Sequence, residues 1–298
     1  MATARPAWME KPKPAVTLLK GVVIGLIVLV MLYPFWYVIV ASLSTAQGLR
    51  QHTGFLLAPA EFTLDAYRAV LSGDIVTQSL LVSVFVTVVG TLLAVVLTVL
   101  TAYGLTRTRD VPGSRALLYL ILFTMLFTAG IIPNYLLIKG VGLLDSLGAL
   151  ILPGAISAFN LVVVRNFFME LPGELLDSAR VDGAGEWRIL SQIVVPLSKS
   201  IIAVIALFYG VSYWNEFFNA LLYLQTPQKW PVQLVLNQYV VQASPLEQIS
   251  FGSRMDSQTA PRTIQMAIVI VATLPILVVY PFLQKYFTKG VLTGAIKG

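Results

Sequence analysis

The sequence predicts an all-α polytopic membrane protein with six transmembrane helices. Of its 298 residues, 57% are hydrophobic and only 11% are charged, whereas globular proteins carry roughly 25% charged residues. The mean hydropathy is +0.82. The charged residues gather between apolar stretches long enough to cross a bilayer. A soluble domain of this length would bury far less apolar sequence, so we expect an integral membrane protein.

The first apolar run follows a basic segment, residues 1–20, which contains three prolines and is expected to be an irregular N-terminal tail. Residues 21–43 are too long for the apolar core of a signal peptide and lack a clear small-residue cleavage site. We interpret them as a retained first membrane helix, kinked or tilted near Pro34. Residues 45–75 are polar, and a helix over 63–71 is expected to lie outside the membrane.

The second, third and fourth apolar runs follow in order. No charge occurs between Asp74 and Arg107, which leaves room for a tilted second helix. A third helix is predicted over 116–138, interrupted by Gly130 and by Pro133-Asn134, and a fourth apolar run covers 147–168.

The last third of the chain supplies two more spans. Residues 201–224 form a fifth apolar run, broken by the cluster from Tyr213 to Asn219. Residues 225–262 are polar, with a possible outer-face helix over 232–241, and the sixth helix is predicted over 263–283. The permease domain would therefore cover 21–288, followed by a cytoplasmic tail, 289–298.

The distribution of Lys and Arg predicts the orientation. The net charge of +6 does not form one nucleic-acid-binding patch, because the bases sit at the ends of apolar runs. With six spans, fourteen of the 20 bases fall on the side that holds both termini and six fall on the other side. Bases are enriched on the cytoplasmic side. We therefore expect a multi-pass protein of the bacterial inner membrane, with both termini in the cytoplasm.

Residues 170–200 interrupt the apolar pattern with five acids and three bases, so they are expected to face cytoplasmic water. Acids in the first turn favour a short helix over 174–180, and Gly183 can adopt the left-handed backbone that ends a helix. A second helical run, 186–194, leads to Pro196, expected in the first turn of the next membrane helix. The alternative is an ordinary solvated loop that contains a helix.

The same loop contains Asp177-Ser178-Ala179, three residues, Gly183, nine residues, and then Ile193-Val194-Val195-Pro196. This spacing resembles the EAA loop of permease subunits of ABC importers, whose pattern is E-A-A, three residues, G, nine residues, I-x-L-P. Asp177, Ser178 and Val195 are conservative departures from Glu, Ala and Leu. The resemblance implies the MetI-like fold of type I importers. It also implies residues that couple to an ATPase: Asp177, Ser178, Ala179, Asp182, Gly183 and Pro196. A change at Glu186, beyond the bend, is expected to be mild.

Further segments are similar to carbohydrate-importer permeases of the LplC and YtcP type, relatives of the MalG maltose permease. They are YWNEFFNALLYL and YPFLQKYFTKGVLTGAIKG, and the similarity covers most of residues 75–298. Within this group the resemblance extends to the second permease subunit of bacterial alginate importers. The family implies a second, different permease, two ATPase subunits, a periplasmic or extracellular solute-binding protein and a carbohydrate substrate.

The chain shows no catalytic or metal-binding constellation of its own. It has no cysteine and a single histidine, His52, which leaves no set of metal ligands. It lacks the Gly-Lys pair of a phosphate-binding loop. We therefore expect no cofactor in this chain and no enzymatic activity, with ATP and Mg²⁺ bound by the partner ATPase.

One cluster in the fifth apolar run is a candidate for the substrate pathway. Glu216 is the only charged residue that clearly interrupts an apolar segment, and such residues usually face a cavity or a partner helix. If the segment is helical, Asn215 and Asn219 share a face beside Glu216. Tyr213 could stack on a sugar ring. The alternatives are that Glu216 lies at the outer interface or packs against a neighbouring helix, and that the aromatic residues anchor the interface.

Other functional classes fit the sequence less well. An ABC importer for a non-sugar solute would have the same loop. A secondary transporter would normally show more ionisable groups in its spans, and repeated halves. A membrane enzyme such as a glycosyltransferase would need a carboxylate, His or metal constellation, which Glu216 alone does not provide.

Overall fold

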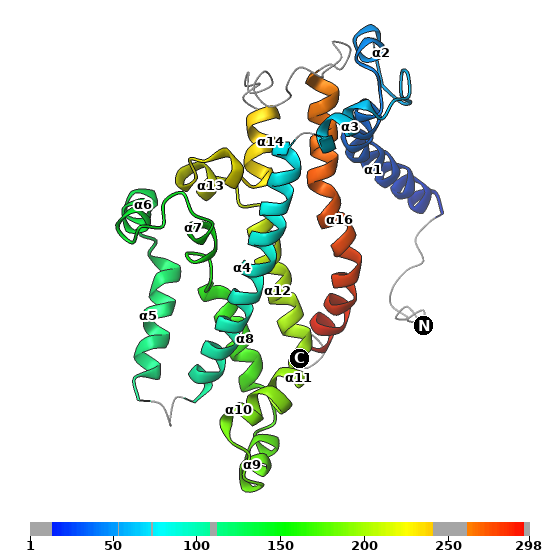
Figure 1. Ribbon diagram of the computed structural model, residues 1–298. Coiled ribbons are helices and arrows are strands. Elements are labelled where there is room, and N and C mark those ends of the chain that lie inside the picture. The colour runs from blue at the N-terminus through cyan, green and yellow to red at the C-terminus, as the bar shows by residue number, and fades with distance from the viewer. Residues whose placement is uncertain (1–13, 53, 73, 108–111, 241–260, 295–298) are drawn as a thin grey trace. The chain divides into compact units, whose positions relative to one another are not determined.

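The structure is helical, as expected. The computed structural model describes residues 14–52, 54–72, 74–107, 112–240 and 261–294 (Figure 1). Among these residues there is no β-strand, and the one β-bridge is an isolated antiparallel bridge between Ser44 and Phe62. The contacts divide the chain into two compact units, each considered by itself: residues 1–70 with 253–270, and residues 71–252 with 271–298.

The first unit contains α1 (Pro14–Ser42), α2 (Ala46–Gln51) and most of α3 (Asp65–Ser72). α1 begins at Pro14, so the expected irregular tail is wrong over residues 14–20. Proline suits a first helical position, because the N–H it lacks would have no partner there. α3 confirms the helix expected over 63–71.

Hydrogen bonds hold the segment after α1 against the end of that helix. The hydroxyls of Ser42 and Tyr67 lie 2.7 Å apart, and the N–H of Thr45 donates to the carbonyl of Glu61 at 3.0 Å. The Thr45 side chain also accepts the N–H of Gly48 and caps α2. These contacts fix the first unit's polar segment locally.

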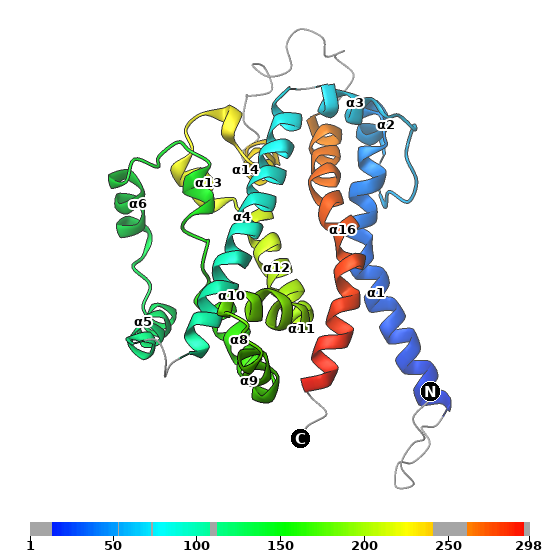
Figure 2. The same ribbon diagram turned by 60° about the horizontal axis from the view of Figure 1, so that its bottom comes forward.

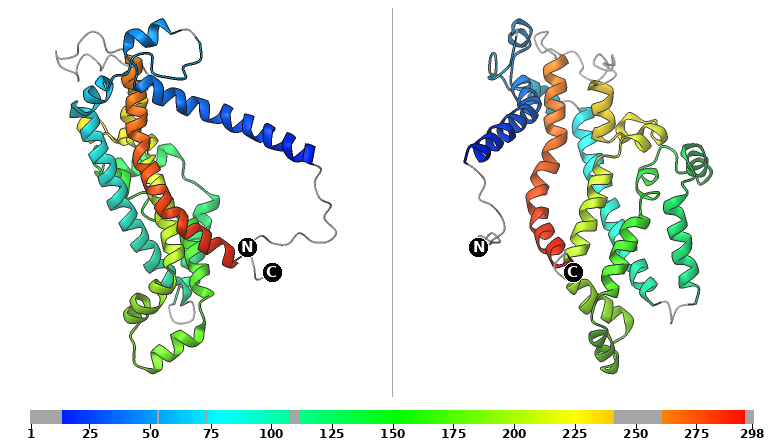
Figure 3. Two further views of the ribbon diagram at one scale, coloured as in Figure 1. Left: turned by 90° about the vertical axis from the view of Figure 1, so that its right-hand side faces the viewer. Right: turned by 180° about the vertical axis from the view of Figure 1, so that it is seen from behind.

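The second unit is built around α4 (Asp74–Thr106), the continuous helix expected between Asp74 and Arg107. α4 packs against α12 (Lys199–Trp214) and α8 (Ala158–Met169), and the three helices lie side by side in Figures 1 and 3. α14 (Val232–Val240) also contacts α4. It confirms the helix expected over 232–241, up to its last described residue.

Three helices are long and apolar enough to cross a membrane: Pro14–Ser42, Ile75–Thr106 and Arg262–Val279. The bent pair Glu186–Leu197 and Lys199–Trp214 makes a fourth if it is counted as one span. These figures refer to the described residues, so the expected number of six is not established by helix length.

The other expected spans are broken. α5 (Ser114–Leu126) and α6 (Ile131–Gly140) are separated before Gly130, whose φ is 85°. α7 (Gly148–Ile151) is separated from α8 around Pro153-Gly154. α13 (Phe218–Tyr223) follows α12 after a gap at Asn215–Phe217. The interruption predicted at Gly130 is confirmed, but the one predicted at Pro133-Asn134 is wrong, because both residues lie within α6, where proline is tolerated in the first turn. The break in the apolar run 147–168 was not predicted.

The last helix is longer than expected. α16 (Pro261–Gly294) passes Pro275 and Pro281 and continues beyond residue 283. The proposed tail 289–298 is therefore helical up to Gly294. Part of the polar segment before α16, residues 241–260, lies outside the described residues.

Two tyrosines of α12 satisfy the backbone at the break between α7 and α8. The Tyr213 hydroxyl donates to the carbonyl of Ile151 at 2.8 Å. The N–H of Ser157 donates to the Tyr209 hydroxyl at 2.9 Å, and that hydroxyl lies 2.7 Å from the hydroxyl of Thr98 on α4. An apolar environment offers no water to replace these partners. The break is therefore stable because α12 faces it.

Gly90 of α4 permits this arrangement, because an added Cβ would lie 2.8 Å from the ring of Tyr213. We expect Gly90→Ala to lower the free energy of unfolding of the purified protein by roughly 1–3 kcal/mol through overpacking. The matched control is Gly104→Ala on the same helix, where an added Cβ meets nothing within 4 Å. Thermal unfolding in detergent measures both. Equal melting temperatures for the two variants would contradict the assigned contact.

The side chain of Asp145 connects two turns of the second unit, its own and the one that begins at Gln225. Asp145, at a φ of 53°, accepts hydrogen bonds at the turn that contains the short helix η2 (Pro227–Lys229). The hydroxyl of Thr226, the ammonium of Lys229 and two backbone N–H groups, of Thr226 and Gln225, hold the pKa of Asp145 well below its ordinary value. The charged form is therefore the one that the fold stabilises.

This pKa shift predicts a pH dependence. A carboxyl group whose pKa is lower in the folded protein stabilises the fold fully at pH values above its unfolded pKa of about 3.9. This stabilisation is lost progressively as the pH falls from that value through the lower folded pKa. The difference in melting temperature between the wild type and Asp145→Asn should be full at pH 7 and smaller at pH 3.5. Asp65→Asn, which removes an exposed pair with Arg68, is the control and should show a smaller difference at pH 7. A gap that widens in acid would refute the assignment.

Candidate coupling site

The charged loop forms a helix, a bend and a second helix. α9 (Gly173–Val181) ends at the bend, and α10 (Glu186–Ile189) runs into the π-helix η1 (Leu190–Val194) and then α11 (Val195–Leu197). In Figures 1 and 3, α9 and α10 lie beyond the end of α4 and α8, at the far end of the second unit. The helices expected over 174–180 and 186–194 are confirmed in outline.

The bend forms for the reason predicted from the sequence. Gly183 has a φ of 79°. The N–H of Ala184 donates to the carbonyl of Ala179, and the N–H of Gly183 to that of Arg180, both at 2.9 Å. These two bonds form a Schellman motif, which satisfies carbonyls at the end of α9. An added Cβ at Gly183 meets nothing within 4 Å, so its requirement is conformational and not steric.

Pro196 is not where the sequence predicted it. It lies in α11, and the next membrane helix, α12, begins only at Lys199 after a bend of 82°. Figure 2 shows α10 and α11 running across the direction of α12. A π-helix precedes Pro196, whose missing N–H removes one bond of an ordinary helical ladder. Pro196 therefore lies before the bend, in α11, and not in the first turn of α12.

The predicted coupling residues divide into two groups. Asp177, Ser178, Asp182 and Gly183 are exposed. Ala179 instead faces inward and packs against a cluster that joins the loop to α4 and α8. The members of this inner cluster, as we call it, are Val99, Ala102, Tyr103, Val164, Phe168, Ile189, Leu190, Val194 and Ile205.

Two exposed apolar residues of the loop were not predicted from the sequence to be functional. Val181 is 88% exposed and Trp187 is 73% exposed. They are the most exposed large apolar side chains of residues 170–200. Their position within a charged segment was a signal available in the sequence.

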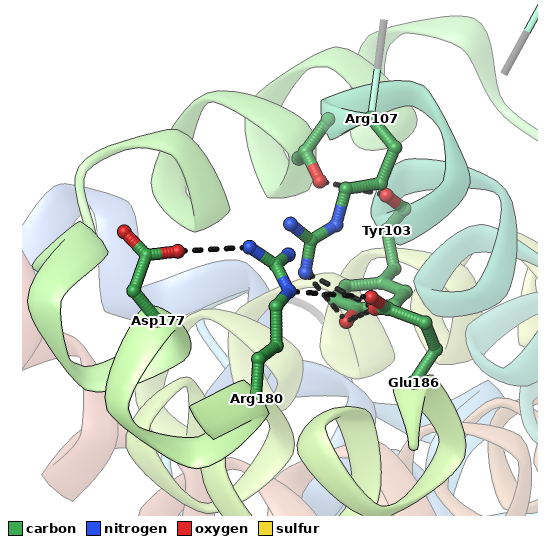
Figure 4. A network of polar contacts seen from close by, with 6 residues as sticks. Tyr103, Arg107, Asp177, Arg180 and Glu186 are labelled. Carbon is green, nitrogen blue, oxygen red and sulfur yellow. Dashed lines mark hydrogen bonds and ion pairs between the residues drawn. The ribbon is translucent and has the colours of Figure 1, made fainter. Parts of the chain in front are cut away.

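A polar network, shown in Figure 4, ties the loop to α4. One oxygen of the Glu186 carboxylate accepts a hydrogen bond from the Tyr103 hydroxyl and pairs with Arg107 at 3.1 Å. The other oxygen lies 3.5 Å from Nε of Arg180, and Arg180 pairs with Asp177 at 2.9 Å. From the start of α10, Glu186 thus contacts both α4 and α9. The expectation that a change at Glu186 is mild did not include these contacts.

The structure does not place Asn215, Glu216 and Asn219 on one continuous helix. α12 ends at Trp214, and Asn215 is exposed at its C-terminal cap. Glu216 accepts the N–H of Asn219 at 3.3 Å and so bridges the break before α13. Tyr213 is 4% exposed and engaged with Ile151. The predicted face depended on a continuous helix, which the break removes.

Residues 15–293 match a family described as the binding-protein-dependent transport system inner membrane component. The chain belongs to this family. It is therefore a multi-pass inner membrane protein and a permease component of an ABC importer.

The described residues contain no group of three or more His, Cys, Asp or Glu side chains that could hold a metal ion.

Two relatives from Bacillus subtilis (strain 168) are similar over almost their whole length. The polygalacturonan/rhamnogalacturonan transport system permease protein YtcP is 49% identical, covering 91% of this chain and 94% of the relative. Protein LplC is 46% identical, covering 90% of each. The sn-glycerol-3-phosphate transport system permease protein UgpE of Rhizobium meliloti (strain 1021) is 27% identical, over 95% and 99%.

Among solved structures, a chain of a bacterial ABC transporter involved in the import of the acidic polysaccharide alginate is 31% identical. It matches with a TM-score of 0.86, covering 94% of this chain and 100% of that one. This likeness confirms the MetI-like fold inferred from the EAA loop, and it agrees with the sequence resemblance to alginate importer permeases.

The bend predicts that Gly183 tolerates no side chain without strain. Gly183→Ala should weaken the end of α9 by on the order of 1 kcal/mol, because an L-residue disfavours a left-handed backbone. Gly185→Ala is the matched control, since Gly185 has a φ of −69° and an added Cβ there also meets nothing within 4 Å. Hydrogen exchange of the α9 amides measures the difference, and equal protection in both variants would contradict it.

The inward position of Ala179 predicts a different kind of defect. Ala179→Asp should place a carboxylate against the inner cluster and loosen the loop, because a charge in partly apolar surroundings loses hydration without gaining a partner. Ser178→Asp, which adds the same charge at an exposed neighbour, should leave the loop folded. Limited proteolysis of the purified protein between residues 170 and 200 distinguishes the two. Equal cleavage rates would place Ala179 at the surface.

Proposed function

We propose that this chain and a second, different permease form the translocation pathway for a sugar, an oligosaccharide or a polysaccharide, and that the EAA loop docks on one of two ATPase subunits. The observation that carries the docking is the projecting helix, bend and helix with Val181 and Trp187 exposed on it. ATP and Mg²⁺ are held by the ATPase. A solute-binding protein outside the membrane delivers the substrate.

The coupling role falls to Asp177, Ser178, Asp182 and Gly183 at the docking surface. Ala179 supports α9 from within, and Pro196 ends the segment before the 82° bend. Asn215 and Asn219 contribute to the pathway. Glu216 contributes indirectly. Its carboxylate accepts the Asn219 N–H and so holds the backbone between α12 and α13.

A carbohydrate substrate is supported by the relatives' names. YtcP, at 49% identity, is named for polygalacturonan and rhamnogalacturonan, and the alginate transporter chain, at 31%, belongs to an importer of an acidic polysaccharide. We therefore infer that oligosaccharides containing uronic acids are the substrate class to test first. A glycerol phosphate substrate, as named for UgpE, is the second candidate, but that relative is only 27% identical.

The orientation rests on the charge count. We propose six crossings, in which α5 with α6, α7 with α8 and α12 with α13 are broken spans, and both termini lie in the cytoplasm. The permease domain, residues 21–288, would then be flanked by short cytoplasmic ends. α1, which begins at Pro14, and α16, which ends at Gly294, extend into these ends. Reporter fusions after Arg109 and Gly183 should read cytoplasmic, and fusions near Glu61 and Gln248 external. An external signal at Gly183 would refute both the orientation and the docking.

Reconstitution of the whole complex tests the function. Vanadate-sensitive ATP hydrolysis should rise several-fold when the binding protein is loaded with oligogalacturonide, and sn-glycerol 3-phosphate should have no effect. The reverse result would assign a non-sugar solute. Uptake driven by an ion gradient, without hydrolysis, would instead indicate a secondary transporter.

A further inference from the structure

Two residues at the end of α4 contact the coupling loop, residues 170–200: Tyr103 in its last turn, and Arg107, which follows the helix directly. Tyr103 and Arg107 are four positions apart and therefore lie on one face. Nη2 of Arg107 donates to the Tyr103 hydroxyl at 3.0 Å and to Glu186 at 3.1 Å. The Arg107 side chain is only 16% exposed, whereas Glu186 is 55% exposed. The contact thus sits at the rim of the inner cluster.

The Glu186 carboxylate is the shared member of this network. Its two oxygens reach in different directions, one to α4 and the other to Arg180 on α9 (Figure 4). Since Glu186 itself opens α10, one side chain links the helices on both sides of the bend to the membrane helix. No other ion pair of the described residues joins the loop to α4.

The apolar contacts of α9 are less buried than those of the second half of the loop. Ile189, Leu190 and Val194 are buried in the inner cluster, whereas α9 adds the partly buried side chains of Leu176 and Ala179. Apolar packing is non-directional. The Glu186 carboxylate adds polar contacts of defined geometry. It accepts hydrogen bonds from Tyr103 and Arg107 and forms an ion pair with Nε of Arg180 at 3.5 Å. Such contacts favour one angle even where they add little stability.

We propose that Glu186 is a positioning residue that fixes the angle of α9 relative to α4, so that movement of the docked loop is passed into α4 and from there to α12 and α8. The proposal rests on the proposed docking of this loop on an ATPase. It assigns to Glu186, Arg107 and Tyr103 a role in transmission, separate from the residues that make the docking surface.

The first measurement tests the anchor and is independent of transport. The chain has no cysteine, so Val181→Cys, at an 88% exposed site of α9, gives a single spin-label position in the purified full-length protein. Glu186→Gln and Arg107→Gln should both increase the mobility of the label. Arg188→Gln is the matched control, because among the residues that the structure describes the Arg188 side chain bonds to Gln192, within its own segment. An unchanged label in Glu186→Gln would overturn the proposal.

The second measurement tests transmission in the assembled importer. In Glu186→Gln the ATPase should still copurify, while stimulation of hydrolysis by the loaded binding protein should fall at least about fivefold. The double variant with Arg107→Gln should be no worse than either single variant, since both break one network. Tyr103→Phe, which removes a single hydroxyl and keeps all charges, should give a smaller loss in the same direction.

The outcomes separate this proposal from the function on which it rests. A looser label with normal stimulation would make Glu186 a purely structural anchor and overturn the proposal, as would additive losses in the double variant. Loss of the ATPase from Glu186→Gln would place the residue in the docking surface instead. If the wild-type complex shows no stimulation by any loaded binding protein, the proposed function fails, while the spin label still decides whether Glu186 holds α9.

Discussion

The arrangement of the second unit depends on one constraint: a broken helix in an apolar stretch must find its hydrogen-bond partners inside the protein. The break between α7 and α8 finds them on α12, through the hydroxyls of Tyr209 and Tyr213. Tyr213 can approach only because Gly90 of α4 leaves room for its ring. The close contact of α4 with α12 is therefore a condition for the irregular backbone beside it.

That contact continues to the coupling loop through the inner cluster. Fully burying an aliphatic side chain such as Ile189 stabilises by about 1.5–3 kcal/mol, whereas a partly exposed ion pair contributes about 0–1 kcal/mol. Apolar packing thus decides whether the loop is held, and the network around Glu186 decides at what angle. The two functions use adjacent residues of the same helices, and Tyr103 belongs to both.

Two of the three departures of the loop from the family pattern face water, while the third, Val195, is partly buried against the inner cluster. Asp177 replaces a glutamate and pairs with Arg180 at 2.9 Å, and Ser178 replaces an alanine at an exposed position. The matching residues meet stricter demands. Gly183 adopts a left-handed backbone, and Ala179 fits against the inner cluster. The shape of the bend is therefore retained although the leading residues of the motif differ.

Local features were determined by the sequence alone. Low charge and long apolar runs specified membrane helices, the spacing from Asp177 to Pro196 specified the family, and Gly183 specified the bend, because backbone conformation and hydration depend on neighbouring residues. Only the tertiary structure decided the rest. Glu186 meets Arg107 across 79 positions, Tyr213 seals a backbone break 62 positions away, and the polar face at Asn215 is lost where α12 ends. Such contacts depend on how helices pack, and packing brings together residues whose separation in the sequence carries no periodic signal.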